Sequence, residues 1–118
     1  MRRWATVLAT AALLAVSVGA GPAAAQPKVY SGREAAALRC SNTLALTAVA
    51  LNGAELMSDI EKDLMIEITY LILDRHVSGT WHQKKQALRQ VRDRRSVEET
   101  LQDYQRNAAR CLRQFPIN

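Results

Sequence analysis

From residue 31 onward, apolar residues recur at three- and four-residue steps, which is the spacing of one face of an α-helix. The first such stripe consists of Ala37, Cys40, Leu44, Ala48 and Leu51. It predicts a helix from Gly32 or Arg33 to about Leu51. The Asn52-Gly53 pair that follows is typical of a helix end.

A second helix is predicted from about Ser58, or one turn earlier, to between Asp74 and Val77. Its expected inner face comprises Met57, Ile60, Leu64, Ile68 and Leu71. Acidic residues form a separate stripe at four-residue spacing, namely Glu55, Asp59, Asp63 and Glu67. The stretch 64–73 is almost continuously apolar, so we expect it to be either the most buried element or part of a contact with another chain.

The clearest turn, residues 78–80, precedes a third helix that begins at Trp81 and directs Ala87, Leu88 and Val91 inward. No Gly or Pro interrupts 81–114, so one long helix is an alternative. The later apolar stripe, however, points to the opposite side of such a helix. This stripe comprises Val97, Leu101, Tyr104, Ala108, Cys111 and Phe115. We therefore predict a break at 94–96 and a last helix that Pro116 ends.

Four Ser/Thr-x-x-Glu/Gln sequences precede the periodic stretches, and this pattern is the signature of a capping box at a helix start. They are Ser31/Glu34, Ser58/Glu61, Thr80/Gln83 and Ser96/Glu99. The expected fold is therefore all-α, a small closed bundle of about four short helices.

The first 25 residues have the features of a cleaved secretory signal peptide. Arg2 and Arg3 supply the positive start, an apolar run covers 5–18, and small residues fill 23–25 before Gln26. The apolar run is shorter than the roughly 20 residues that a membrane span needs, and no later segment is long enough. We expect a periplasmic or secreted mature protein without a transmembrane segment.

The mature part is expected to consist of an extended lead-in over 26–30 and a single helical domain over 31–118. It carries 14 basic and 11 acidic residues, a net charge of +3. This excess is too small to indicate a nucleic-acid partner. The charges are nevertheless polarised along the chain, because 40–74 hold six acids and one base whereas 75–95 hold seven bases and one acid.

Two cysteines remain after signal cleavage, Cys40 and Cys111, and no CxxC spacing joins them. Each lies on the expected inner stripe of its helix, so a disulfide between them ties the first helix to the last. A metal or redox role is the alternative, although such sites usually need a closely spaced partner. In size, helical content and its single disulfide, the expected protein is similar in broad outline to the small acid-stress chaperones of the bacterial periplasm.

Catalytic and cofactor motifs are absent from the sequence. It contains no GxSxG, no free-cysteine motif and no glycine-rich phosphate loop, so we expect neither an enzyme nor a cofactor. The only histidines, His76 and His82, flank the 78–80 turn, and a metal site there would need Asp74, Met57 or Met65 as further ligands. Surface histidines at helix ends are the favoured interpretation, and no metal is expected.

Two surfaces are candidates for binding. A basic face of the third helix offers an anionic contact to lipid, lipopolysaccharide or an acidic protein, unless the acidic stripe of the second helix balances it within the bundle. Its residues are Lys84, Lys85, Arg89, Arg92 and Arg95. The expected outer side of the second helix is apolar and is a candidate protein interface, unless the bundle buries it. Its residues are Met65, Ile66, Tyr70 and Leu73.

These features favour an exported helical protein that acts by protein contact, as an envelope accessory, chaperone-like or inhibitor-type module. Self-association or a protein partner are both compatible with the apolar side of the second helix. A helical bundle that binds a small ligand or metal is the first alternative. Binding of the anionic envelope through the 84–95 face is the second.

Overall fold

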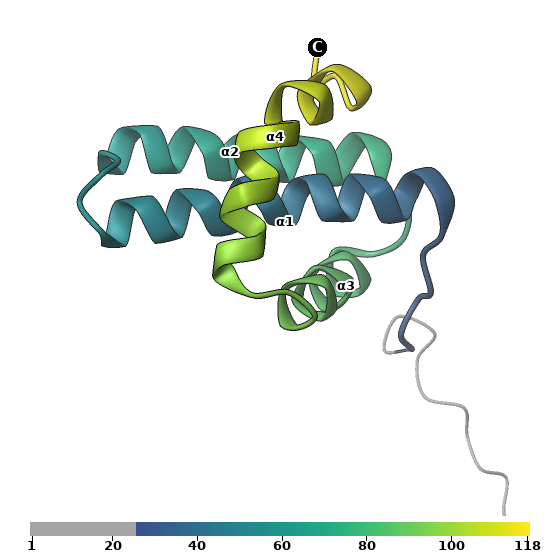
Figure 1. Cartoon of the computed structure of the whole chain (residues 1–118). Helices are drawn as coiled ribbons and strands as arrows, with labels where there is room; N and C mark the ends of the chain where they lie inside the picture. The colour runs from purple at the N-terminus through teal and green to yellow at the C-terminus, as the bar shows by residue number, and fades with distance from the viewer. Residues whose placement is uncertain (1–25) are drawn as a thin grey trace, which may run out of the picture.

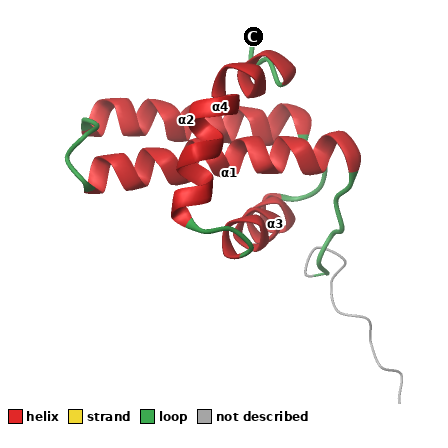
Figure 2. Cartoon of the chain, in the orientation of Figure 1, coloured by secondary structure: helices red, strands yellow, loops and turns green. Residues whose placement is uncertain are grey.

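The computed structural model describes residues 26–118, so the predicted signal peptide lies outside the described residues. Four helices form in this part of the chain, and it contains no strand (Figure 2). They are α1 (Gly32–Gly53), α2 (Asp59–His76), α3 (Trp81–Asp93) and α4 (Val97–Gln114). The prediction of a small all-α fold with about four helices is confirmed, and the bounds agree within a few residues.

Helix α1 is the centre of the arrangement. Helices α1 and α2 form an antiparallel hairpin, α4 crosses this hairpin steeply, and α3 lies below α1 (Figure 1). Helix α1 packs extensively against each of the other three helices. The free end of the hairpin, around the 54–58 loop, projects beyond α4 (Figure 1).

The residues of α1 explain this central position, because nine of them are buried and they cover most of the circumference of the helix. The predicted stripe of Ala37, Cys40, Leu44 and Ala48 is buried as expected. This stripe, however, is only part of the surface that α1 buries against the other three helices. The remaining buried positions include four polar residues, Ser41, Asn42, Thr43 and Thr47, which a purely apolar pattern does not identify.

The predicted faces of α2 are correct only in part, because Ile68, expected inward, packs against the core and Tyr70, expected outward, is 48% exposed. Ile60 and Leu64, expected in the core, are 83% and 56% exposed, whereas Leu73, expected on the outside, is 1% exposed. The buried face of α2 consists of Thr69, Ile72 and Leu73. Helix α2 is therefore not the most buried element.

Three of the four predicted helix starts use the predicted cap. Thr80 and Gln83 form a complete capping box, and the side chains of Ser58 and Ser96 accept a hydrogen bond from the third residue of their helices. At Ser31 the side chain makes no cap. Its expected partner Glu34 instead accepts hydrogen bonds from the backbone N–H of Ser78, at 2.7 Å, and from its hydroxyl, at 2.8 Å.

The predicted break before the last helix is confirmed, because α3 ends at Asp93 and α4 begins at Val97. The stripe of α4 is buried toward its end, where Cys111 and Phe115 are 8% and 2% exposed. Val97, at its start, is 46% exposed rather than inward. Thr100 occupies the buried position there, and its hydroxyl donates to the Ser96 carbonyl.

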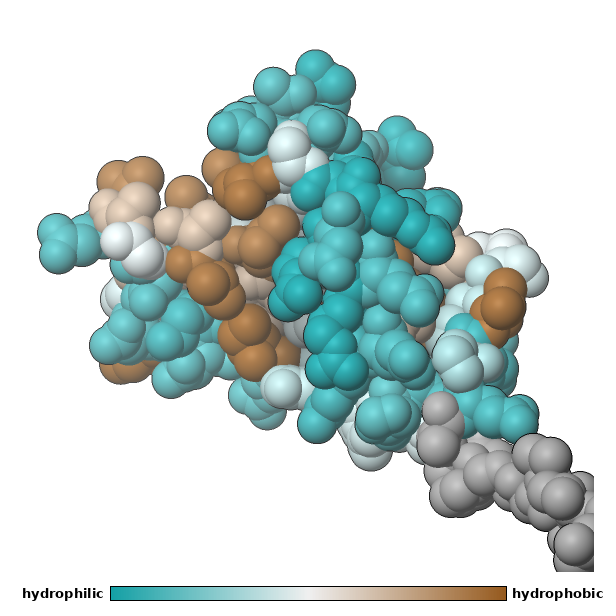
Figure 3. Space-filling view, turned by 90° about the horizontal axis from the view of Figure 1, so that it is seen from below, coloured by the Kyte–Doolittle hydropathy of each residue, from teal (hydrophilic) through white to brown (hydrophobic). Residues whose placement is uncertain are grey.

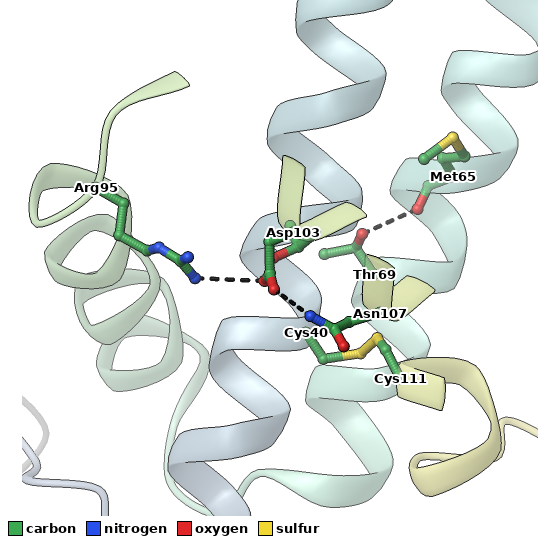
Figure 4. Close-up of a disulfide and its surroundings, with 8 residues drawn as sticks. Cys40, Met65, Thr69, Arg95, Asp103, Asn107 and Cys111 are labelled. Carbon is green, nitrogen blue, oxygen red and sulfur yellow. Dashed lines mark hydrogen bonds and ion pairs between the residues drawn. A yellow bond between two sulfur atoms is a disulfide. The ribbon is translucent and has the colours of Figure 1, made fainter. Parts of the chain in front are cut away.

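The predicted disulfide is confirmed. Cys40 of α1 and Cys111 of α4 are bonded, with their Cα atoms 5.6 Å apart, which is typical of disulfides. Both sulfurs belong to the buried apolar cluster, together with Leu44, Leu73 and Phe115. The bond therefore joins the first and last helices through the core (Figure 4).

Candidate functional site

The two most exposed aliphatic side chains of α2, Ile60 and Leu64, lie one turn apart on one line that continues to the partly buried Leu71. We call this line the α2 outer stripe. It is most open at Ile60 and Leu64, near the free end of the hairpin. Its position follows from the burial of Thr69 and Leu73, which turns the opposite side of α2 toward solvent.

Acidic side chains run along one edge of the α2 outer stripe. Asp59, Asp63 and Glu67 are all exposed and recur at four-residue steps, so they share one side of the helix. Among the described ion pairs, those of α2 involve only Lys62, which lies 3.9 Å from Asp59 and 3.8 Å from Asp63. Pairs this long and this exposed contribute little, so the acidic edge remains available to an external base.

A second apolar surface lies on the other side of the hairpin, between α1 and α3, and we call it the α1–α3 groove. Ala45, Leu46, Val49 and Leu88 supply its apolar lining, and Arg89 and Arg92 stand at its α3 side. Its volume is about 270 Å³. Seen from below, hydrophobic residues gather beside a column of hydrophilic ones (Figure 3).

The residues of the predicted basic face differ in how exposed they are and in whether they already contact other side chains. Lys84 is only 6% exposed, and its Nζ lies 5.0 Å from the centre of the Trp81 ring, so it is not an exposed contact residue. Arg95 pairs with Asp103 at 3.3 Å. Lys85, Arg89 and Arg92 remain exposed, and Arg92 pairs with its neighbour Asp93 at 3.1 Å. Among the described residues no ion pair links these three to α2.

The predicted protein interface on α2 is exposed only in part, because Tyr70 is 48% exposed whereas Leu73 is buried. Leu73 is part of the core, and Met65 packs against it. The ring of Tyr70 meets that of Trp81 edge to face, with centres 5.7 Å apart. Ile66 is partly buried. The prediction that these residues form an outer face is wrong at Leu73, because the buried face of α2 contains Thr69, a polar residue that the apolar pattern excluded.

Asp103 of α4 organises a polar cluster beside the disulfide (Figure 4). Its carboxylate accepts hydrogen bonds from Thr43 of α1 at 3.0 Å, Asn107 at 2.6 Å and Arg95 at 3.3 Å. Burial alone would raise the pKa of Asp103, but the hydrogen bonds from Asn107 and Thr43 and the charge of Arg95 outweigh it and lower the pKa. The cluster joins α1, α4 and the segment between α3 and α4.

The lowered pKa of Asp103 predicts a loss of stability in acid. Because the unfolded chain binds the proton more readily, the contribution of the ionised carboxylate is complete above the unfolded pKa of about 4 and is lost as the pH falls through the lower folded pKa. We expect Asp103→Asn to destabilise the protein by about 1 to 3 kcal/mol at neutral pH and much less in strong acid. Urea unfolding of both proteins across this pH range measures the difference. A difference that does not shrink in acid would contradict the prediction.

The surroundings of the histidines do not contain the set of ligands that a metal ion needs. His76 Nε2 lies 2.7 Å from the Pro116 carbonyl oxygen, and its ring packs against Phe115. Within residues 26–118, no group of three or more His, Cys, Asp or Glu side chains is arranged to hold a metal ion. His76 thus fastens the C-terminal segment to the end of α2.

A further groove, of about 390 Å³, lies at the surface between the lead-in, α1 and α3. The lead-in is held there by hydrogen bonding of Tyr30 and Lys28 to Ser78. Gly79 permits this close approach, because its φ is +96° and a Cβ there would lie 2.8 Å from the Tyr30 hydroxyl oxygen. The hydrogen bonds that Glu34 accepts from the backbone and hydroxyl of Ser78 lower the pKa of that carboxyl.

Comparison with protein-family models, with curated proteins and with solved structures finds no match for this chain. None of the helices within 26–118 combines the length and apolar character needed to cross a membrane. The distinctive surfaces are thus the α2 outer stripe and the α1–α3 groove. Sequence reasoning identified Ile60, Leu64, Arg89 and Arg92 but placed the first two in the core.

Proposed function

We propose that this chain is an exported, periplasmic or secreted helical protein that acts by protein contact through the α2 outer stripe. The observation that carries the proposal is the exposure of two large aliphatic side chains, Ile60 and Leu64, on the side of α2 opposite its buried residues. A helix of a soluble domain normally turns such residues toward the core. Burying each of these side chains against a docked partner stabilises the complex by about 1.5 to 3 kcal/mol.

The acidic edge of the stripe defines the chemistry of the partner. Asp59, Asp63 and Glu67 favour a partner surface that is apolar at its centre and basic along one side. They disfavour an anionic membrane, because the carboxylates would face headgroups of the same charge. The proposal therefore names a protein surface rather than a lipid surface.

The disulfide supports the export part of the proposal. Bonds such as Cys40–Cys111 form and persist mainly in oxidising compartments, which include the bacterial periplasm and the extracellular space. The basic and apolar composition of residues 1–18 supports the same location, because it is typical of a signal peptide.

The contact function is tested with the chain from Gln26 onward, which contains all four helices and the disulfide. A designed amphipathic peptide of leucine and lysine is titrated into isotope-labelled protein and followed by amide NMR shifts. We expect shifts along 60–71, and weaker binding of a matched peptide with glutamate in place of lysine. Ile60→Lys with Leu64→Lys should weaken binding at least about tenfold, because the apolar contact is lost.

Leu112→Lys is the matched control, since Leu112 is 40% exposed on α4, away from the stripe. It should bind the lysine peptide as the unaltered protein does. Equal binding of both peptides, or unchanged binding by the Ile60/Leu64 variant, would refute the assignment of the contact surface.

A further inference from the structure

We infer that the partner of the α2 outer stripe is a second copy of this chain, which receives the stripe in its α1–α3 groove. The inference rests on the proposed function and names its partner. The two surfaces match in polarity and charge, and both are exposed on the same molecule.

The groove has the form that receives a helix. Its walls come from two different helices, with Leu46 and Val49 on α1 and Leu88 on α3, and Val49 is 55% exposed. Ala45 is small, so a helix can approach its backbone closely. An apolar helix face laid into an apolar groove between two helices is a common mode of recognition. The α2 outer stripe, with Ile60 and Leu64 projecting, is such a face.

The groove and the stripe each carry charged residues along one side only, and these charges are opposite in sign. The α3 wall of the groove carries Arg89, which has no described ion pair, and Arg92, which pairs with Asp93 at 3.1 Å. The lining that α1 provides, from Asn42 to Val49, is uncharged. The α2 outer stripe likewise has its run of carboxylates, Asp59, Asp63 and Glu67, along one edge. Placing the acidic edge beside the arginines selects one of the two directions in which the helix can lie in the groove.

Antiparallel pairing of stripe with stripe is a competing form of self-association, and charge disfavours it. In an antiparallel pair of α2 helices, the acidic edge of one copy faces the acidic edge of the other. Like charges then meet at Asp59, Asp63 and Glu67 across the contact. Insertion into the groove replaces this repulsion with pairs between carboxylates and guanidinium groups.

The contact joins two different surfaces. The stripe lies on the side of α2 that faces away from its buried residues, whereas the groove lies on the α3 side of α1. Each copy therefore offers one stripe and one groove. Two copies can exchange them reciprocally in a closed pair, and otherwise the contact continues head-to-tail into chains or rings.

A mixing experiment tests this arrangement by sedimentation velocity. The chain from Gln26 onward should form dimers or larger species as its concentration rises. Ile60→Lys with Leu64→Lys disables the stripe, and Val49→Lys with Arg89→Glu disables the groove, so each variant alone should be monomeric. Mixed together, they should form a one-to-one dimer and nothing larger, because one intact stripe and one intact groove remain. Circular dichroism checks that both variants keep their helices.

Exchanging the charges provides a second arm. Asp63→Lys with Glu67→Lys should weaken the association about tenfold, and adding Arg89→Glu with Arg92→Glu in the same chain should restore it. Leu112→Lys should leave association unchanged.

A chain that stays monomeric at high concentration while its stripe still binds the lysine peptide would overturn the inference and leave the proposed function standing. A mixture of the two variants that stays monomeric would also overturn it.

Discussion

Replacing Cys40 with serine is expected to lower the free energy of unfolding by about 4 kcal/mol. The disulfide links residues 71 positions apart, and closing a loop of this length removes about that much chain entropy from the unfolded state. Small domains have a total stability of about 5 to 15 kcal/mol, so the variant should be close to unfolding at 37 °C. Urea unfolding with and without reductant measures the loss.

The Cys40→Ser/Cys111→Ser double variant is the control for that experiment, because it leaves no free thiol. Its free energy of unfolding should equal that of the unaltered protein in the presence of reductant. If reduction left the unfolding midpoint unchanged, the disulfide would contribute nothing to stability and the core would hold the helices by itself.

Lysine substitution at two positions of α2 is expected to give opposite results. Leu73→Lys should destabilise the protein by about 4 kcal/mol or more, because it forces a charge into a site that is 1% exposed. Leu64→Lys should change the stability of the monomer by no more than about 0.5 kcal/mol, because Leu64 is 56% exposed and lysine is a good helix former. Both variants are compared by urea unfolding at low protein concentration.

This pair of variants discriminates between the two possible orientations of α2 in one measurement. If Leu64→Lys unfolded the protein and Leu73→Lys did not, the face that carries Ile60 would be the core and the assignment of the outer stripe would be wrong.

The helices themselves could be predicted from the sequence, because their signals are local. The capping sequences at Ser58, Thr80 and Ser96 mark where three helices begin, and each cap forms as expected. The opposed apolar stripes on either side of 94–96 correctly required a break. The two cysteines on inner stripes correctly predicted the pairing of α1 with α4.

The orientation of α2 could not be predicted, because its buried face is centred on a residue that reads as polar. The hydroxyl of Thr69 donates to the carbonyl of Met65 in the same helix, at 2.9 Å, so it needs no other partner and packs as a small apolar side chain. With Thr69 counted as polar, the line from Ile60 to Leu71 seemed the better core face.

The α1–α3 groove could not be predicted from the sequence for a different reason. Its lining comes from α1 and α3, and the two contribute Val49 and Leu88 from distant parts of the chain. Periodicity reports which residues share a face of one helix. It does not report which faces of different helices meet, or which apolar residues remain uncovered once they do.

The central place of α1 has a consequence for how the chain folds. Helices α2, α3 and α4 each find their main packing surface on α1, and it is the first of the four to be synthesised. Its buried polar residues, such as Ser41 and Thr47, stay hydrated until the others arrive. The α1–α2 hairpin closes over short chain distances, whereas docking of α4 on α1 closes the longest loop, so we expect it to come last. Oxidation of the cysteines is then expected to complete folding rather than to direct it.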